Sequence, residues 1–172
     1  SIDSCLKCKK ISKIVVSTND EKALRTLKKK YLFSKRILFH KREQKLSLFN
    51  TPIIDTLKNC MNFLRKKNIK FDYVYSVNTS YPFISENDFN NSFNILDFFK
   101  LDRVIGVLKE KNNFYFHNGK TLKKINDDTT LRLEKNEIYA EPGSISIFDK
   151  KNMFKKKDQN WSYYFRKIKL FS

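Results

Sequence analysis

The clearest alternation of hydrophobic and polar positions lies in the middle of the chain. Bulky β-forming side chains fill every second position of residues 71–77, which predicts a strand with one aromatic face. Polar residues from Asn78 to Ser80 follow, and Pro82 ends the strand because proline has no N–H for a ladder hydrogen bond. Ligands of open α/β sheets lie outside the carboxyl ends of the strands. This turn is therefore a candidate binding site; an ordinary strand-to-helix turn is the alternative, and the pattern alone favours it.

The remaining elements follow similar patterns. Apolar residues at helical spacing predict the end of a helix in residues 1–10, further helices in residues 20–31, 51–64 and 85–99, and a short basic helix after residue 148. Thr51 is expected to cap the third helix, and Ser85 with Asp88 resembles a capping box at the fourth. Short apolar runs predict strands in residues 14–16, 36–40, 103–108, 144–148 and 163–171, and Asn118-Gly119 predicts a hairpin turn within residues 114–125.

Strands alternate with helices through residue 108, which is typical of a sheet with helices on both faces. We therefore expect one α/β domain over residues 1–172, a three-layer sandwich around a mostly parallel, mixed sheet. Its 172 residues suffice for a substantial core, and 16 Phe and 8 Tyr favour a folded globule.

Cysteine and hydropathy patterns bear on the cellular setting. No apolar run approaches the ~20 residues of a membrane span, and no signal peptide heads the chain. The three cysteines are an odd number, which argues against a disulfide framework. We therefore expect a reducing, cytoplasmic setting and no membrane partner.

Cys5 and Cys8 have the spacing of half a zinc site. A structural zinc site needs four ligands, and the only other candidates are Cys60, His40 and His117. Because the pair lies in an apolar, helix-periodic segment, we expect both thiols to face a packing surface instead. No metal ligands are assigned.

The net charge of +18 draws anionic ligands such as nucleotides. Only seven of the 36 basic residues are Arg, and the lysines are spread along the whole chain. Nucleic-acid readers usually cluster their charge and depend on Arg. A nucleic-acid-binding module is therefore an alternative that is supported by charge alone.

The three glycines, at positions 106, 119 and 143, exclude a Walker loop and a dinucleotide fingerprint within the chain. His117 lies beside the predicted hairpin turn and is expected at the surface. No Ser/His/Asp order supports a nucleophilic site, so no catalytic residue is assigned.

Four segments, taken in order, resemble the cytidylyltransferase family that makes CMP-activated acid sugars, represented by acylneuraminate cytidylyltransferase (CMP-sialic acid synthetase). They are IVVSTND, HKREQKLS, VNTSYPFI and the segment from Arg132 to EPGSISIF. They are similar to the family's strand ending in Ser-Thr-Asp, its Arg-Pro-x-x-Leu loop, its Gln-Pro-Thr-Ser-Pro-Leu turn and its Arg-rich loop before Asn-Gly-Ala-Ile-Tyr. The resemblance spans nearly all of the chain.

The resemblance implies a nucleotide-diphospho-sugar transferase-like fold and transfer of CMP from CTP to an acidic 2-keto sugar, with release of pyrophosphate. It implies Mg²⁺ as cofactor, CTP and an acidic sugar as ligands, and a possible homodimer. The implied nucleotide-binding residues are Ser17, Thr18 and Arg42, and the implied substrate-binding residues are Asn78, Ser80 and Arg132.

The chain also departs from the family pattern. The family's phosphate loop would precede Ser1 and its magnesium-associated Asp-x-Asp segment would follow Ser172. Asn78 replaces a Gln, Pro142 an Asn, and Ser146 a Tyr. We therefore expect that the chain as given does not turn over CTP at a useful rate. The alternatives are a non-catalytic or truncated remnant of the family, or another nucleotidyl- or glycosyltransferase of the same architecture.

Overall fold

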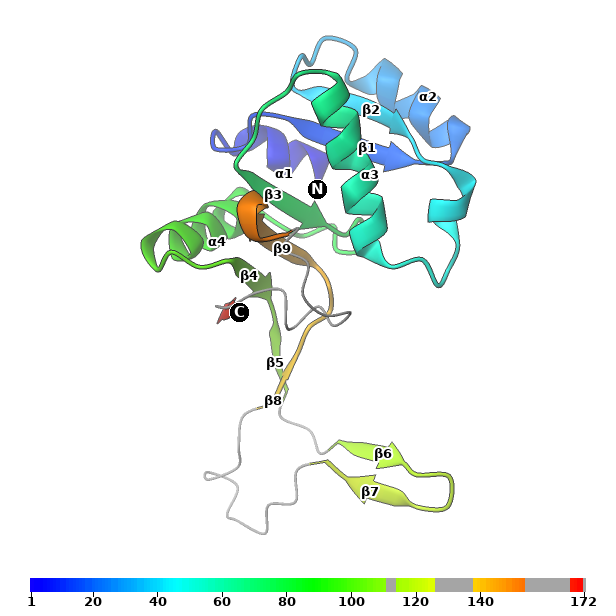
Figure 1. Ribbon diagram of the computed structural model, residues 1–172, viewed down its shortest axis with the longest axis vertical. Helices are drawn as coiled ribbons and strands as arrows, with labels where there is room; N and C mark the ends of the chain where they lie inside the picture. The colour runs from blue at the N-terminus through cyan, green and yellow to red at the C-terminus, as the bar shows by residue number, and fades with distance from the viewer. Residues whose placement is uncertain (111–113, 126–137, 154–167, 172) are drawn as a thin grey trace.

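The computed structural model describes residues 1–110, 114–125, 138–153 and 168–171 (Figure 1). Its helices are α1 (Ile2–Lys7), α2 (Glu21–Lys30), the 3₁₀ helix η1 (Gln44–Ser47), α3 (Ile53–Lys66), α4 (Glu86–Phe98) and α5 (Lys150–Met153). Its strands are β1 (Ile14–Thr18), β2 (Ile37–Lys41), β3 (Tyr73–Val77), β4 (Arg103–Gly106), β5 (Leu108–Glu110), β6 (Tyr115–His117), β7 (Leu122–Lys124), β8 (Ile138–Ala140), β9 (Ile145–Asp149) and β10 (Ile168–Phe171). The mixed α/β class is confirmed.

The strands form four sheets, β1-β2, β10-β4-β9-β3, β5-β8 and β6-β7. Two of the described ladders are parallel, β1 with β2 and β10 with β4, and the other four are antiparallel. The expected mostly parallel sheet is therefore not confirmed. The reason is β9, which lies between β3 and β4 and runs antiparallel to both. The three-layer sandwich stays a prediction.

The alternation in β3 directs its side chains to two different helices. On one face Val74 packs against Met61 of α3 and Phe148 of β9. On the other face Tyr73 and Tyr75 make edge-to-face ring contacts with Phe93 and Phe89 of α4, at centroid distances of 5.2 and 5.3 Å. Edge-to-face contact is a favoured arrangement of aromatic rings. The central strand thus lies between two helices, as its sequence pattern predicts.

Side chains next to the helix start cap α2 and α4. Asp20 is the N-cap of α2, and Ser85 with Asp88 forms a complete capping box at α4. The prediction that Thr51 caps α3 is wrong, because the N-cap is Pro52 and makes no side-chain bond. The Thr51 hydroxyl instead donates to the backbone oxygen of Lys45 in η1 at 3.1 Å.

Cys5 and Cys8 face a packing surface, as expected. Both are buried in one cluster with Ile11, Ile84, Phe89 of α4 and Ile145 of β9. Gly106 permits a close approach to β9, because a Cβ there would lie 3.0 Å from Cγ2 of Ile145. None of the helices in the described ranges is both long and apolar enough to cross a membrane.

Strands β6 and β7 form the predicted hairpin, which lies apart from the helices in Figure 1. Asn118 organises its turn, because Oδ1 accepts hydrogen bonds from the N–H groups of Lys120 and Thr121. Gly119 has a φ of 92°, a conformation that glycine adopts without steric cost. His117 is exposed, as expected.

Candidate functional site

The carboxyl ends of β1 and β2 lie together at one edge of their parallel sheet. The register pairs Ser17 with His40 and Thr18 with Lys41. The N–H of Arg42 donates to the backbone oxygen of Thr18 at 2.9 Å, so the ladder continues one residue past β2. This register brings together all three residues expected to bind a nucleotide: Ser17, Thr18 and Arg42.

The Arg42 side chain is held by Ser17. Its Nη2 donates to the Ser17 backbone oxygen at 2.6 Å, and its Nε donates to the Ser17 Oγ at 3.4 Å. Lys41 and Lys45 on either side have acidic partners, Glu21 at 2.5 Å and Glu43 at 2.8 Å. Within the described residues Arg42 has no carboxylate partner and Nη1 has no hydrogen bond. A half-buried guanidinium with free donors is therefore available to a ligand.

Behind Arg42 lies a small polar cluster that sequence reasoning missed. Nδ1 of His40 lies 3.0 Å from Ser17 Oγ and 3.9 Å from Sγ of Cys60 on α3. Burial, and then the charge of Arg42, lower the pKa of His40 below its ordinary 6.5. Burial raises the pKa of the Cys60 thiol. In the sequence, His40 and Cys60 stand out only as weak metal-ligand candidates. Their contact depends on the β1–β2 register and on the packing of α3, which local sequence patterns do not reveal.

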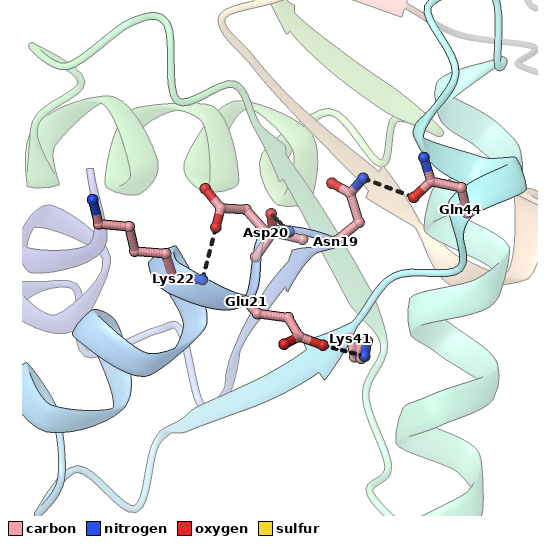
Figure 2. A network of polar contacts seen from close by, with 7 residues as sticks. Asn19, Asp20, Glu21, Lys22, Lys41 and Gln44 are labelled. Atoms are coloured by element: carbon pink, nitrogen blue, oxygen red, sulfur yellow. Dashed lines mark hydrogen bonds and ion pairs between the residues drawn. The ribbon is translucent and has the colours of Figure 1, made fainter.

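The turn after β1 is built by its own side chains (Figure 2). The Thr18 hydroxyl oxygen accepts from the Asp20 N–H at 3.1 Å, and Asp20 in turn caps α2. Asn19 Nδ2 donates to Oε1 of Gln44 at 3.2 Å, so this turn is tied to η1. Thr18 thus has a structural role, and its role toward a nucleotide stays a prediction.

Asn78 and Ser80 lie after β3, and both are exposed. Oδ1 of Asn78 accepts from the Ser80 N–H at 2.9 Å, which is the side-chain-to-backbone turn weighed as the alternative. The Asn78 Nδ2 group has no hydrogen bond within the described residues, so it remains available to a ligand. No hydrogen bond in the described ranges joins Asn78 or Ser80 to Ser17 or Arg42.

Two of the sequence segments that resemble the cytidylyltransferase family, VNTSYPFI and EPGSISIF, lie side by side. Val77 pairs with Ile145, and the Asn78 N–H donates to the Ser144 backbone oxygen at 3.0 Å. The loop of residues 142–144 is therefore next to the turn after β3. Arg132 lies outside the described residues, so its predicted role is unchanged.

The described residues contain no group of three or more His, Cys, Asp or Glu side chains that could hold a metal ion. Glu43, which follows Arg42 in sequence, pairs with Lys45, and Glu21 pairs with Lys41. These side chains do not fit a magnesium site, so we assign no step to a metal.

No family model matches the chain, and no curated protein sequence matches it. Solved structures do match, among them the following two. The 4-diphosphocytidyl-2C-methyl-D-erythritol synthase from Anaerococcus prevotii has a TM-score of 0.63 at 19% identity, and the match covers 99% of this chain and 73% of the synthase. The bifunctional IspDF from Campylobacter jejuni has a TM-score of 0.54 at 20% identity, and the match covers 97% of this chain but only 41% of the bifunctional protein. At these identities the likeness shows a shared fold: the chain has the α/β fold of these two proteins.

Proposed function

We propose that the chain binds CTP and transfers CMP to an acidic 2-keto sugar, as acylneuraminate cytidylyltransferases do, with release of pyrophosphate. The single observation that carries the nucleotide part is Arg42, a guanidinium anchored on Ser17 at a strand end and without a carboxylate partner in the described residues. The four-segment resemblance supports the proposal, and so does the fold shared with a synthase whose product carries a diphosphocytidyl group. The three-layer sandwich of the nucleotide-diphospho-sugar transferases belongs to the same proposal.

In this proposal Arg42 donates hydrogen bonds to the cytidine half of the nucleotide, and Ser17 and Thr18 line the same edge. Arg42→Ala is expected to weaken CTP and CMP binding by roughly tenfold or more, the order of one lost hydrogen bond to a charged group. Calorimetric titration of both nucleotides measures the effect. Arg25→Ala, an exposed change on α2, is the matched control and should leave affinity unaltered. Equal affinities for the wild type and Arg42→Ala would refute the assignment.

The sugar half of the proposal depends on Asn78, Ser80 and Arg132. The free amide of Asn78 and the exposed Ser80 hydroxyl suit a ligand rich in hydroxyl groups. Arg132 is the only arginine between Arg103 and Arg166. A guanidinium grips a carboxylate through two parallel bonds, which lysine cannot do, so Arg132 is proposed to bind the sugar carboxylate.

The first structural neighbour favours a second candidate, in which the acceptor is a methylerythritol compound rather than an acid sugar. A third is a non-catalytic chain that only binds nucleotide. Pyrophosphate release with CTP, magnesium and a panel of both acceptor types separates them. We expect release with acid sugars. Release with methylerythritol phosphate alone supports the second candidate, and nucleotide binding without release with either acceptor type supports the third.

Magnesium is implied by the resemblance, where it would neutralise the triphosphate. Since the described side chains supply no site for it, nothing in the proposal is routed through the ion. We also propose a cytoplasmic setting, supported by three free cysteines, which are typical of a reducing compartment.

We also propose that two copies of the chain form a homodimer through the β6–β7 hairpin. Tyr115, Phe116 and Leu122 of the β6–β7 hairpin are 46–68% exposed. A lone two-stranded hairpin is only marginally stable in water, so contact with a second copy would stabilise it. Light scattering on the purified chain tests this, and a monomer at all accessible concentrations would contradict it.

A further inference from the structure

His40 has no role in the proposed function, yet it lies at the centre of the cluster behind Arg42. Its ring contacts three residues on two elements: Ser17 on β1, and Cys60 and Phe63 on α3. The Phe63 ring lies 4.9 Å from the imidazole between centroids, at an interplanar angle of 49°. Ser17 is the residue that holds both Nε and Nη2 of Arg42.

The hydrogen bonds around Ser17 are directional. Nε of Arg42 can only donate, so the Ser17 Oγ accepts from it. The hydroxyl hydrogen is then free to be donated to Nδ1 of His40, 3.0 Å away, which requires a neutral ring with its proton on Nε2. The charged groups that face His40 are Arg42, which opposes protonation, and Glu43, which favours it. Cys60 faces the same ring as an uncharged thiol.

We propose that His40 is a positioning residue for Arg42: as a neutral imidazole it orients the Ser17 hydroxyl, which holds the guanidinium in its ligand-binding pose. The inference rests on the proposed nucleotide binding by Arg42. It adds a proton-dependent step to that site, because a protonated Nδ1 donates to Ser17 and no longer accepts its hydrogen. A protonated ring also places a second positive charge beside the guanidinium.

The direction of the pH dependence follows from the lowered pKa of His40. In the unfolded chain the ring takes up a proton near pH 6.5, whereas in the folded chain it does so only at lower pH. The stability contributed by the neutral ring is therefore complete above 6.5 and is lost as the pH falls toward the folded-state pKa. Nucleotide affinity is expected to fall with protonation of the folded ring.

The first experiment needs no nucleotide. The NMR signal of the Arg42 Nε–H group is followed against pH in the wild type, in His40→Asn, in Ser17→Ala and in His117→Asn. Asn can place its amide oxygen where Nδ1 accepts, but it does not titrate. His117 is the only other histidine and is exposed on the hairpin, so it is the matched control. The Arg42 signal should titrate together with His40 in the wild type and in His117→Asn, and should stay constant in His40→Asn and in Ser17→Ala. A constant Arg42 signal in the wild type would overturn the inference.

The second experiment measures CTP and CMP affinity across the same pH range. Because nucleotide phosphates also titrate near pH ~6, the decisive quantity is the difference between the wild type and His40→Asn. Between about pH 7.5 and pH 5.5 the wild type should lose roughly threefold more affinity than His40→Asn, the order expected for one weakened hydrogen bond to a charged group. Identical pH profiles would sink the positioning role. If the Arg42 signal titrates with His40 but the protein binds neither CTP nor CMP, the coupling is supported and the proposed function is overturned.

Discussion

Replacing Phe89 by alanine is expected to lower the free energy of unfolding by about 3–5 kcal/mol, the range for removing a fully buried phenylalanine. The side chain is 0% exposed and belongs to the cluster that joins α1 to α4. It makes the edge-to-face contact with Tyr75. The Tyr75 hydroxyl donates to the backbone oxygen of Phe89 at 2.7 Å, so that bond does not depend on the ring. The loss therefore measures ring packing and the cavity left behind.

Urea denaturation followed by circular dichroism measures this change. Phe98→Ala is the matched control, because Phe98 lies on the same helix and is 80% exposed. A surface change of this kind should cost about 0.5 kcal/mol or less. Losses of equal size at Phe89 and Phe98 would contradict the packing described for α4.

The second large effect is expected at Arg36, where Arg36→Met should lower the free energy of unfolding by about 3 kcal/mol. The guanidinium donates to the backbone oxygens of Leu6 at 2.6 Å and Cys8 at 2.8 Å, and also to that of Ile11. The last carbonyl groups of a helix have no partner within it, so Arg36 satisfies the end of α1 and its outgoing loop. It also complements the negative pole of the helix. Methionine keeps much of the apolar stem but removes every donor.

Arg36→Lys is expected to recover only part of the loss, because an ammonium cannot reproduce the planar fork of donors. Arg25→Met, on the exposed face of α2, serves as the control and should change stability by about 0.5 kcal/mol or less. Amide hydrogen exchange gives a local readout, since exchange in α1 should accelerate in Arg36→Met before the rest of the chain responds. Unaltered exchange in α1 would show that Arg36 does not hold this helix.

Most elements of the fold were predictable because they are encoded by neighbouring residues. The alternation in β3, the capping box of α4 and the Asn118-Gly119 turn all depend on contacts within a few positions. The cap of α3 was mispredicted because the Thr51 hydroxyl donates to the backbone oxygen of Lys45 in η1. A helix-cap pattern does not consider a partner that precedes the helix.

The candidate site was predictable only in part. Ser17, Thr18 and Arg42 follow from a resemblance in short segments, and the β1–β2 register brings them together. His40 and Cys60 could not be assigned to that site, because a strand residue and a helix residue twenty positions apart carry no local signal of meeting. The side-chain bond between Asn78 and the Ser80 N–H was weighed as the alternative to sugar binding, and it forms, while Nδ2 stays free.

The sequence by itself determined where most of the described strands and helices lie, and that the carboxyl ends of β1 and β3 carry polar turns. Those properties depend on periodicity and on local hydrogen bonds. The sequence did not predict η1, β8 or the separation of β4 from β5. Only the tertiary structure decided which strands pair, and in which direction. The return of β9 between β3 and β4 made that sheet mixed, because strand order is set by long-range packing. The same long-range packing placed His40 against Ser17, and so behind Arg42, because the parallel register of β1 with β2 sets these neighbours.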